Sequence, residues 1–85
     1  MINPNSSVEI YTSRTCGYCY AAKSALQSHG LKYTEYDVTV DDAKRAEMVR
    51  RSGLRTVPQI FIDGQSIGGY RELAKLLAEK AEKKD

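Results

Sequence analysis

The sequence VEIYT at residues 8–12 is followed, after three residues, by Cys16-Gly17-Tyr18-Cys19, and this stretch decides the expected fold. Its first five residues have the character of a strand, and a helix that begins near Gly17 would place Cys16 at its N-terminus. Unpaired N–H groups and the helix dipole favour a negatively charged sulfur there. Cys19 follows one turn later, close enough to form a small disulfide ring. The arrangement predicts reversible thiol chemistry.

The two cysteines are the only ones in the chain, and they are expected to have different roles. Cys16 precedes the helix, has Arg14 two residues upstream and should be the more exposed, so it is the predicted nucleophile. Cys19 lies inside the first turn and is the predicted resolving thiol. Two buried structural cysteines at helical spacing are the simplest alternative. A zinc site is disfavoured, because it needs two more ligands and His29 is the only other soft one.

The remaining residues predict a single α/β domain over residues 1–85. Apolar residues at helical spacing, helix caps and a tight-turn signal at Asp63-Gly64 place the other elements. The order β-α-β-α-β-β-α implies a four-stranded mixed sheet flanked by three helices, with a polar segment before it and a charged tail after it. The predicted helices span residues 17–29, residues 41 or 42 to 51, and a segment after residue 69. The predicted later strands span 31–38, 59–62 and 66–67, and the end segments are 1–7 and 80–85.

The composition disfavours several classes of function. The chain has 85 residues, of which 41% are hydrophobic and 28% charged, as in an ordinary globular domain with one modest core. Its net charge of +2 comes from Lys and Arg spread among Asp and Glu, so no nucleic-acid partner is expected. No apolar run approaches the roughly 18 residues of a membrane span, and residues 1–7 lack the apolar region of a signal peptide. We therefore expect a cytoplasmic protein, in which a close cysteine pair indicates redox chemistry.

Two further motifs suggest a binding groove. Thr56-Val57-Pro58 opens a strand, and in a redox domain its Pro can be cis, with the backbone groups of Val57 left to pair with an extended thiol peptide. Gly68-Gly69 precedes the last helix and would let a ligand approach the backbone. The N–H groups of Tyr70 and Arg71 would then offer a carboxylate site at a helix N-terminus.

Together these motifs resemble the glutaredoxins, small thioredoxin-fold oxidoreductases that use glutathione. The matching segments span nearly the whole chain: 10–12, 16–19, 22–23, 55–64 and 67–69. The resemblance implies glutathione as co-substrate and disulfide-containing or glutathionylated proteins as partners. It also implies a glutathione groove formed by Tyr18, the loop Thr56-Val57-Pro58 with a cis-Pro, and the turn Gly69-Tyr70-Arg71. Arg45 matches a position that often contacts the glycyl carboxylate of glutathione.

The chain departs from the family pattern at three positions. Gly17 replaces the usual Pro between the cysteines. Ser13 stands where the family often has Lys, and Arg14, one residue later, is the candidate to supply that charge to glutathione. Arg71 stands where an acidic or small polar residue often lies near the ammonium group of glutathione, and Glu72 is the alternative partner for that group.

The leading interpretation is a monomeric glutathione-dependent thiol–disulfide oxidoreductase. The alternative from another class is a dimer that binds a [2Fe–2S] cluster through Cys16 and one glutathione from each protomer, which the small Gly17 favours. A thioredoxin-like reductase served by a flavoprotein is disfavoured, because the chain lacks that family's Trp. Several other residues are predicted to have structural roles only. Lys23 should solvate its helix, His29 should lie at a helix end, and Arg50 and Arg51 should lie on a solvated face. The apolar face of the second helix is predicted to consist of Ala43, Ala46, Met48 and Val49.

Overall fold

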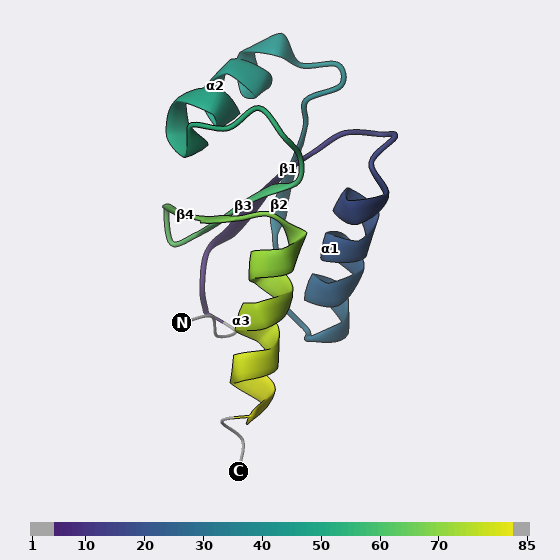
Figure 1. Ribbon diagram of the computed structural model, residues 1–85, viewed down its shortest axis with the longest axis vertical. Helices are drawn as coiled ribbons and strands as arrows, with labels where there is room; N and C mark the ends of the chain where they lie inside the picture. The colour runs from purple at the N-terminus through teal and green to yellow at the C-terminus, as the bar shows by residue number, and fades with distance from the viewer. Residues whose placement is uncertain (1–4, 83–85) are drawn as a thin grey trace.

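The computed structural model describes residues 5–82, with side chains as far as residue 79. The elements follow the predicted order β-α-β-α-β-β-α (Figure 1). Residues 1–4 and residues 83–85 of the charged tail lie outside the described part of the chain. The elements are β1 (Val8–Thr12), α1 (Gly17–Ser28), β2 (Thr34–Asp37), α2 (Asp42–Ser52), β3 (Gln59–Ile62), β4 (Gln65–Gly68) and α3 (Tyr70–Glu82).

The four strands form one mixed sheet in the order β2-β1-β3-β4. β1 pairs with β2 in parallel and with β3 antiparallel, and β3 pairs antiparallel with β4. The turn between β3 and β4 has Asp63 and Gly64 at positive φ, as a tight two-residue hairpin requires. The predicted four-stranded mixed sheet with three helices is confirmed.

The alternation of side chains along the strands divides the core into two layers. Ile10 and Ile60 face one layer, which also contains Leu26 of α1 and Leu73 of α3. These two helices lie side by side in Figure 1. On the opposite face, Tyr11 and Phe61 pack against α2, with Val38 and Met48 completing the cluster. The sheet is therefore covered on both faces, and the N-termini of α1 and α3 are held close to the loop before β3.

The second strand is shorter than the predicted range 31–38. β2 begins only at Thr34, which pairs with Glu9. In this parallel register Leu31 would need a partner at residue 6, before β1 begins at Val8. Leu31 instead lies in the connection after Gly30 and fills the core next to α1. Leu31 is therefore apolar because it is buried in a loop, and not because it belongs to a strand.

The second helix has a narrower apolar face than its spacing predicts. Asp41 caps its N-terminus by accepting from the N–H of Lys44, and Gly53 ends it at a φ of 77°. Met48 is buried and Val49 is half-buried, but Ala43 and Ala46 are exposed.

Arg51 does not lie on a solvated face, which corrects the prediction. Its guanidinium donates to both carboxylate oxygens of Glu9, at 3.3 and 2.9 Å, and to the hydroxyl of Tyr11 at 2.7 Å. It also lies over the Phe61 ring, 4.0 Å from the centroid. Arg51 therefore ties α2 to β1, whereas Arg50 is exposed as predicted.

Candidate active site

The two cysteines meet at the start of α1. Cys16 has extended backbone angles and is the N-terminal cap of the helix, and its Sγ accepts a hydrogen bond from the Cys19 N–H at 3.1 Å. The sulfur thus satisfies one of the N–H groups that a helix leaves without an intrahelical partner. On its other side the Cys16 thiol lies 3.6 Å from the carbonyl oxygen of Val57. Its position joins the helix to the loop before β3.

The two thiols differ in accessibility and acidity. Cys16 is half-buried, whereas Cys19 is 1% exposed. Burial, together with the hydrogen bond and charge of Cys16, raises the pKa of Cys19 to about 12. Cys19 is therefore a neutral thiol at physiological pH, and Cys16 is the sulfur that a substrate can reach.

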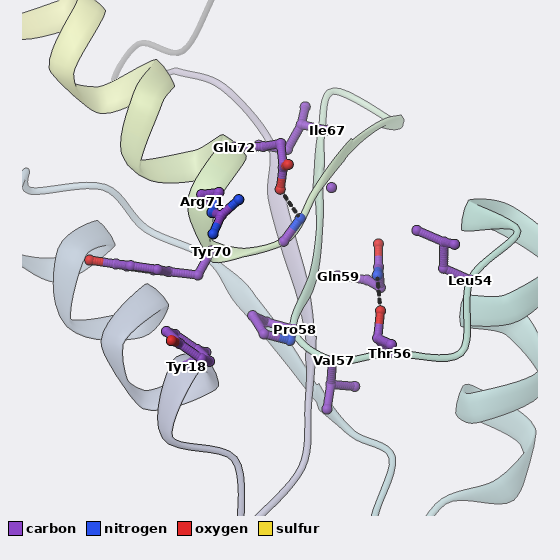
Figure 2. A pocket seen from close by; sticks show the side chains of 12 residues that line it. Tyr18, Leu54, Thr56, Val57, Pro58, Gln59, Ile67, Tyr70, Arg71 and Glu72 are labelled. Atoms are coloured by element: carbon purple, nitrogen blue, oxygen red, sulfur yellow. Dashed lines mark hydrogen bonds between the residues drawn. The ribbon is translucent and has the colours of Figure 1, made fainter.

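A groove of about 820 Å³ lies along the loop that contains Val57 (Figure 2). Cys16 contacts the Val57 carbonyl but is not among the residues that line the groove. Tyr18, which is 68% exposed, and Tyr70 stack at one end with ring centroids 5.8 Å apart. The loop with a cis Val57-Pro58 peptide forms one wall, and the turn before α3 forms the other. The groove is lined by Tyr18, Leu54, Thr56, Val57, Pro58, Gln59, Ile67, Gly68, Gly69, Tyr70, Arg71 and Glu72.

The glycine pair gives the groove its second wall. A Cβ at Gly69 would lie 3.3 Å from the carbonyl oxygen of Pro58, so this backbone and the Pro58 loop approach closely because no side chain intervenes. The Gly69 N–H donates to Glu72 Oε1 at 2.8 Å, which caps α3 and holds the pKa of Glu72 below its usual value. Glu72 is therefore already engaged in capping. The first N–H groups of α3, from Tyr70 onward, have no intrahelical acceptor.

Arg14 lies on the other side of the cysteines and does not line this groove. Its side chain donates to Asp37 at 2.8 Å, which lowers the pKa of Asp37, and its N–H donates to Thr39. Arg14 and Asp37 line a smaller pocket of about 250 Å³ together with Cys16 and Cys19. Arg45, exposed on α2, lines neither pocket.

Lys23 has a more specific position than the predicted solvation of its helix. Its Nζ lies 2.9 Å from Glu35, which also accepts from the Thr12 hydroxyl. Burial raises the pKa of Glu35, but these two hydrogen bonds outweigh it and leave the pKa below its usual value. The hydrogen bond to Glu35 raises the pKa of Lys23. This polar network forms the floor of the smaller pocket, beside Cys19.

The groove also contains residues that sequence reasoning missed: Leu54, Gln59 and Ile67. Gln59 directly follows Pro58 at the start of a strand, and this position was the available signal that it could border the groove. For Leu54 and Ile67 the sequence carried no such signal, because apolar character alone does not show which residues border a groove.

The described side chains of a single chain do not form a site for a metal ion or cluster. Among residues 5–79, no group of three or more His, Cys, Asp or Glu side chains is arranged to hold a metal. Cys16 could offer one thiolate, so the predicted [2Fe–2S] cluster would need its other ligands from outside the chain.

Comparison with known proteins shows the family of the chain. Residues 8–67 match the family model described as Glutaredoxin. The chain belongs to the glutaredoxin family. Glutaredoxin 3 of Escherichia coli K12 is 52% identical over 71 residues, which cover 84% of this chain and 86% of that protein. The predicted family is therefore confirmed.

Solved glutaredoxin structures share the fold. A glutaredoxin from Brucella melitensis has a TM-score of 0.73 and 42% identity, with 86% of this chain and 79% of that one covered. A buckwheat glutaredoxin–glutathione complex has a TM-score of 0.78 and 26% identity, with 91% and 73% covered. Family membership and the adjacent Cys16 and Cys19 thiols identify the protein as a thiol–disulfide oxidoreductase. Within residues 5–82, no helix has the length and apolar character needed to span a membrane.

Proposed function

We propose that the protein is a dithiol oxidoreductase that uses glutathione, with Cys16 as nucleophile and Cys19 as resolving thiol. The observation that carries the proposal is the position of Cys16 Sγ. It is stabilised at 3.1 Å by the Cys19 N–H and lies 3.6 Å from the Val57 carbonyl at the margin of the groove. The buckwheat relative, crystallised as a glutathione complex, supports glutathione as the ligand.

In the proposed complex, glutathione extends along the groove beside Cys16. Its cysteinyl backbone pairs with Val57, and Tyr18 and Tyr70 pack against it. The γ-glutamyl carboxylate accepts from the first N–H groups of α3 at Tyr70 and Arg71, where the helix dipole also favours an anion. Thr56, Pro58 and Gly69 shape the walls.

Two of the predicted glutathione-binding residues, Arg14 and Arg45, do not line the groove. Arg45 would act on the glycyl carboxylate from outside the groove, as a charge in solvent. Arg14 would first have to leave its ion pair with Asp37, 2.8 Å away. We therefore expect both to affect glutathione affinity less than the groove residues do.

The proposed reaction begins with a mixed disulfide between glutathione and a substrate thiol. The Cys16 thiolate attacks the glutathionyl sulfur, the substrate sulfur leaves with the bonding electrons and takes up a proton, and Cys16 is left glutathionylated. The thiolate of a second glutathione then attacks the glutathionyl sulfur of this adduct. Glutathione disulfide forms and Cys16 leaves as a thiolate.

With a protein disulfide, Cys16 forms a mixed disulfide to one substrate sulfur and Cys19 resolves it. Cys19 must lose its proton, attack Cys16 and release the substrate thiol as the Cys16–Cys19 disulfide forms. Burial is the largest cause of its raised pKa and persists, but the hydrogen bond and the charge of Cys16 also raise it, and these come from the reduced partner. Once Cys16 is in a disulfide these causes fall away, so Cys19 becomes more acidic at the step that needs it. Glutathione then reduces the internal disulfide.

Turnover of a glutathione mixed disulfide with a small thiol tests the assignment. We expect Cys16→Ser to abolish turnover and Cys19→Ser to retain much of it, because the second glutathione can resolve the adduct without Cys19. With a protein disulfide, both variants should lose most activity. Normal turnover by Cys16→Ser would overturn the role of Cys16.

The proposed setting is the cytoplasm, where glutathione keeps thiols reduced. The proposed partners are disulfide-containing or glutathionylated proteins, on which a monomer would act.

A further inference from the structure

The groove has a second end that the proposed glutathione contacts leave unused. Figure 2 shows Tyr18 and Tyr70 on one side of the groove and Leu54 and Gln59 on the other. Leu54 and Gln59, with Ile67 and Gly68 of β4, also line the groove. We call these four residues the distal compartment.

The compartment contains a buried polar atom that lacks a partner. Gln59 is 2% exposed, and its Nε2 donates to the Thr56 hydroxyl at 3.1 Å. Its Oε1 has no hydrogen-bond partner among the described residues. In Figure 2 this oxygen points away from Thr56 into the space between Leu54 and the β4 side of the groove. A buried carbonyl without a partner costs free energy, which a donor on a ligand would recover.

The structure accounts for only one half of this amide. Gln59 begins β3 on the same face as Phe61, between the buried residues Pro58 and Ile60. Its Nε2 is used by the hydrogen bond to Thr56, whereas no described residue uses its Oε1. The oxygen is therefore the part of the amide that a ligand group with a donor could recognise.

The walls around this oxygen are apolar. Leu54 is 50% exposed, although it is a large aliphatic residue, and Ile67 is half-buried. Gly68 has a φ of 109°, and a Cβ there would lie 2.9 Å from the Glu72 side chain, so this position adds no side chain to the wall. The compartment therefore fits an apolar group next to an N–H donor.

We propose that the distal compartment binds a residue next to the reactive cysteine of a polypeptide disulfide substrate. The apolar side chain of that residue contacts Leu54 and Ile67, and a main-chain N–H donates to Gln59 Oε1. Glutathione does not supply this combination, because its glycine has no side chain and its γ-glutamyl group is charged. An extended chain advances roughly 3.3 Å per residue and carries an N–H at each step. The inference rests on the proposed function, since it assumes that substrates enter this groove.

The test compares three substrates: the mixed disulfide of glutathione with 2-mercaptoethanol, and the symmetric disulfides of two pentapeptides, one with leucine and one with glycine on both sides of its cysteine. Gln59→Met keeps the length of the side chain and removes both the unpartnered acceptor and the donor to the Thr56 hydroxyl. We expect it to raise KM for both peptides about fivefold to tenfold, the effect of one hydrogen bond, with kcat within about twofold. Because Thr56 also lines the groove, the deciding quantity is the comparison between substrates: KM for the peptides should rise by a larger factor than KM for the glutathione substrate. Gln65→Met, an exposed Gln outside the groove, is the matched control.

Leu54→Ser provides a second arm that does not perturb the core, since Leu54 is half-exposed. Wild-type protein should prefer the leucine peptide, and Leu54→Ser should remove that preference. The proposal is overturned if Gln59→Met raises KM for the glutathione substrate by the same factor, because Gln59 would then belong to the glutathione site. It is also overturned if no KM changes, because Oε1 would then be merely hydrated. Absence of turnover of the glutathione substrate by wild-type protein would instead refute the proposed function.

Discussion

At the scale of single residues, the site depends on the difference between two thiols three positions apart. The helix start leaves Cys16 half-buried, 3.6 Å from the carbonyl oxygen of the groove residue Val57, and buries Cys19. The same hydrogen bond from the Cys19 N–H that stabilises the Cys16 sulfur also places the two sulfur-bearing residues in contact. The first turn of α1 thus gives the two cysteines different environments, which suit Cys16 to act as nucleophile and Cys19 as resolving thiol.

Alkylation should separate the two thiols. At pH 7.5, iodoacetamide is expected to modify Cys16 and to leave Cys19 unmodified, because Cys19 is 1% exposed and its pKa is about 12. Peptide mapping by mass spectrometry measures both sites. Urea-unfolded protein is the control, in which both should react. Equal modification of both cysteines in the folded protein would contradict the assignment.

At the scale of elements, α2 contacts the sheet through both an apolar cluster and the polar contacts of Arg51. It buries one full side chain, Met48, and the guanidinium of Arg51 joins Glu9, Tyr11 and Phe61. Arg51 holds the pKa of Glu9 below its usual value, against the opposing effect of burial. A carboxyl with a lowered pKa stabilises the fold at neutral pH, and this contribution is lost as pH falls below 4.5.

Neutralising this arginine should therefore loosen α2. Arg51→Met, which keeps an apolar side chain over Phe61, is expected to lower the free energy of unfolding by about 1–3 kcal/mol, because it leaves Glu9 without its charged partner. The loss of stability on acidification should also become smaller. Urea unfolding at pH 7 and pH 4 measures both effects. Arg50→Met is the matched control, with an expected change within about 0.5 kcal/mol; equal effects at both positions would refute the role of Arg51.

The elements themselves were largely predictable, because they depend on local signals. The strand Gln59–Ile62, the turn Asp63-Gly64 and the helix stop at Gly53 follow from periodicity and backbone preference. The length of β2 and the place of Arg51 did not follow, since both depend on the register and on partners far away in the chain. In the site, the adjacent cysteines were predictable. The pairing of Arg14 with Asp37 was not, because it depends on β2 lying beside β1.

At the scale of the whole molecule, the sheet with helices on both faces brings three separate segments together. The start of α1, the loop before β3 and the start of α3 meet at one groove, although residues 18, 56–58 and 69–71 come from three separate parts of the sequence. The groove is therefore a product of the fold, and it should be lost when the fold unfolds. The buried groups beside it make that stability depend on pH.

Stability should fall in alkaline solution. The pKa of Cys19 is raised to about 12 and burial raises that of Tyr11, so the folded state keeps protons that the unfolded chain releases. Stability from these groups is present at neutral pH and is lost as pH rises above roughly 8.5, where an unfolded Cys ionises. Thermal unfolding between pH 7 and 10 should show a falling Tm, with a shallower slope in Cys19→Ala. An identical slope in that variant would remove Cys19 as a cause.

The central claim is that glutathione on Cys16 lies in the groove rather than in the smaller polar pocket on the other side of the cysteines. Backbone amide chemical shifts of Cys19→Ser, compared before and after glutathionylation of Cys16, test it directly. We predict the largest distant shifts at Val57, Tyr70 and Arg71. Shifts confined to Arg14, Lys23 and the β2 residues Glu35 and Asp37 would place glutathione in the smaller pocket and contradict the account.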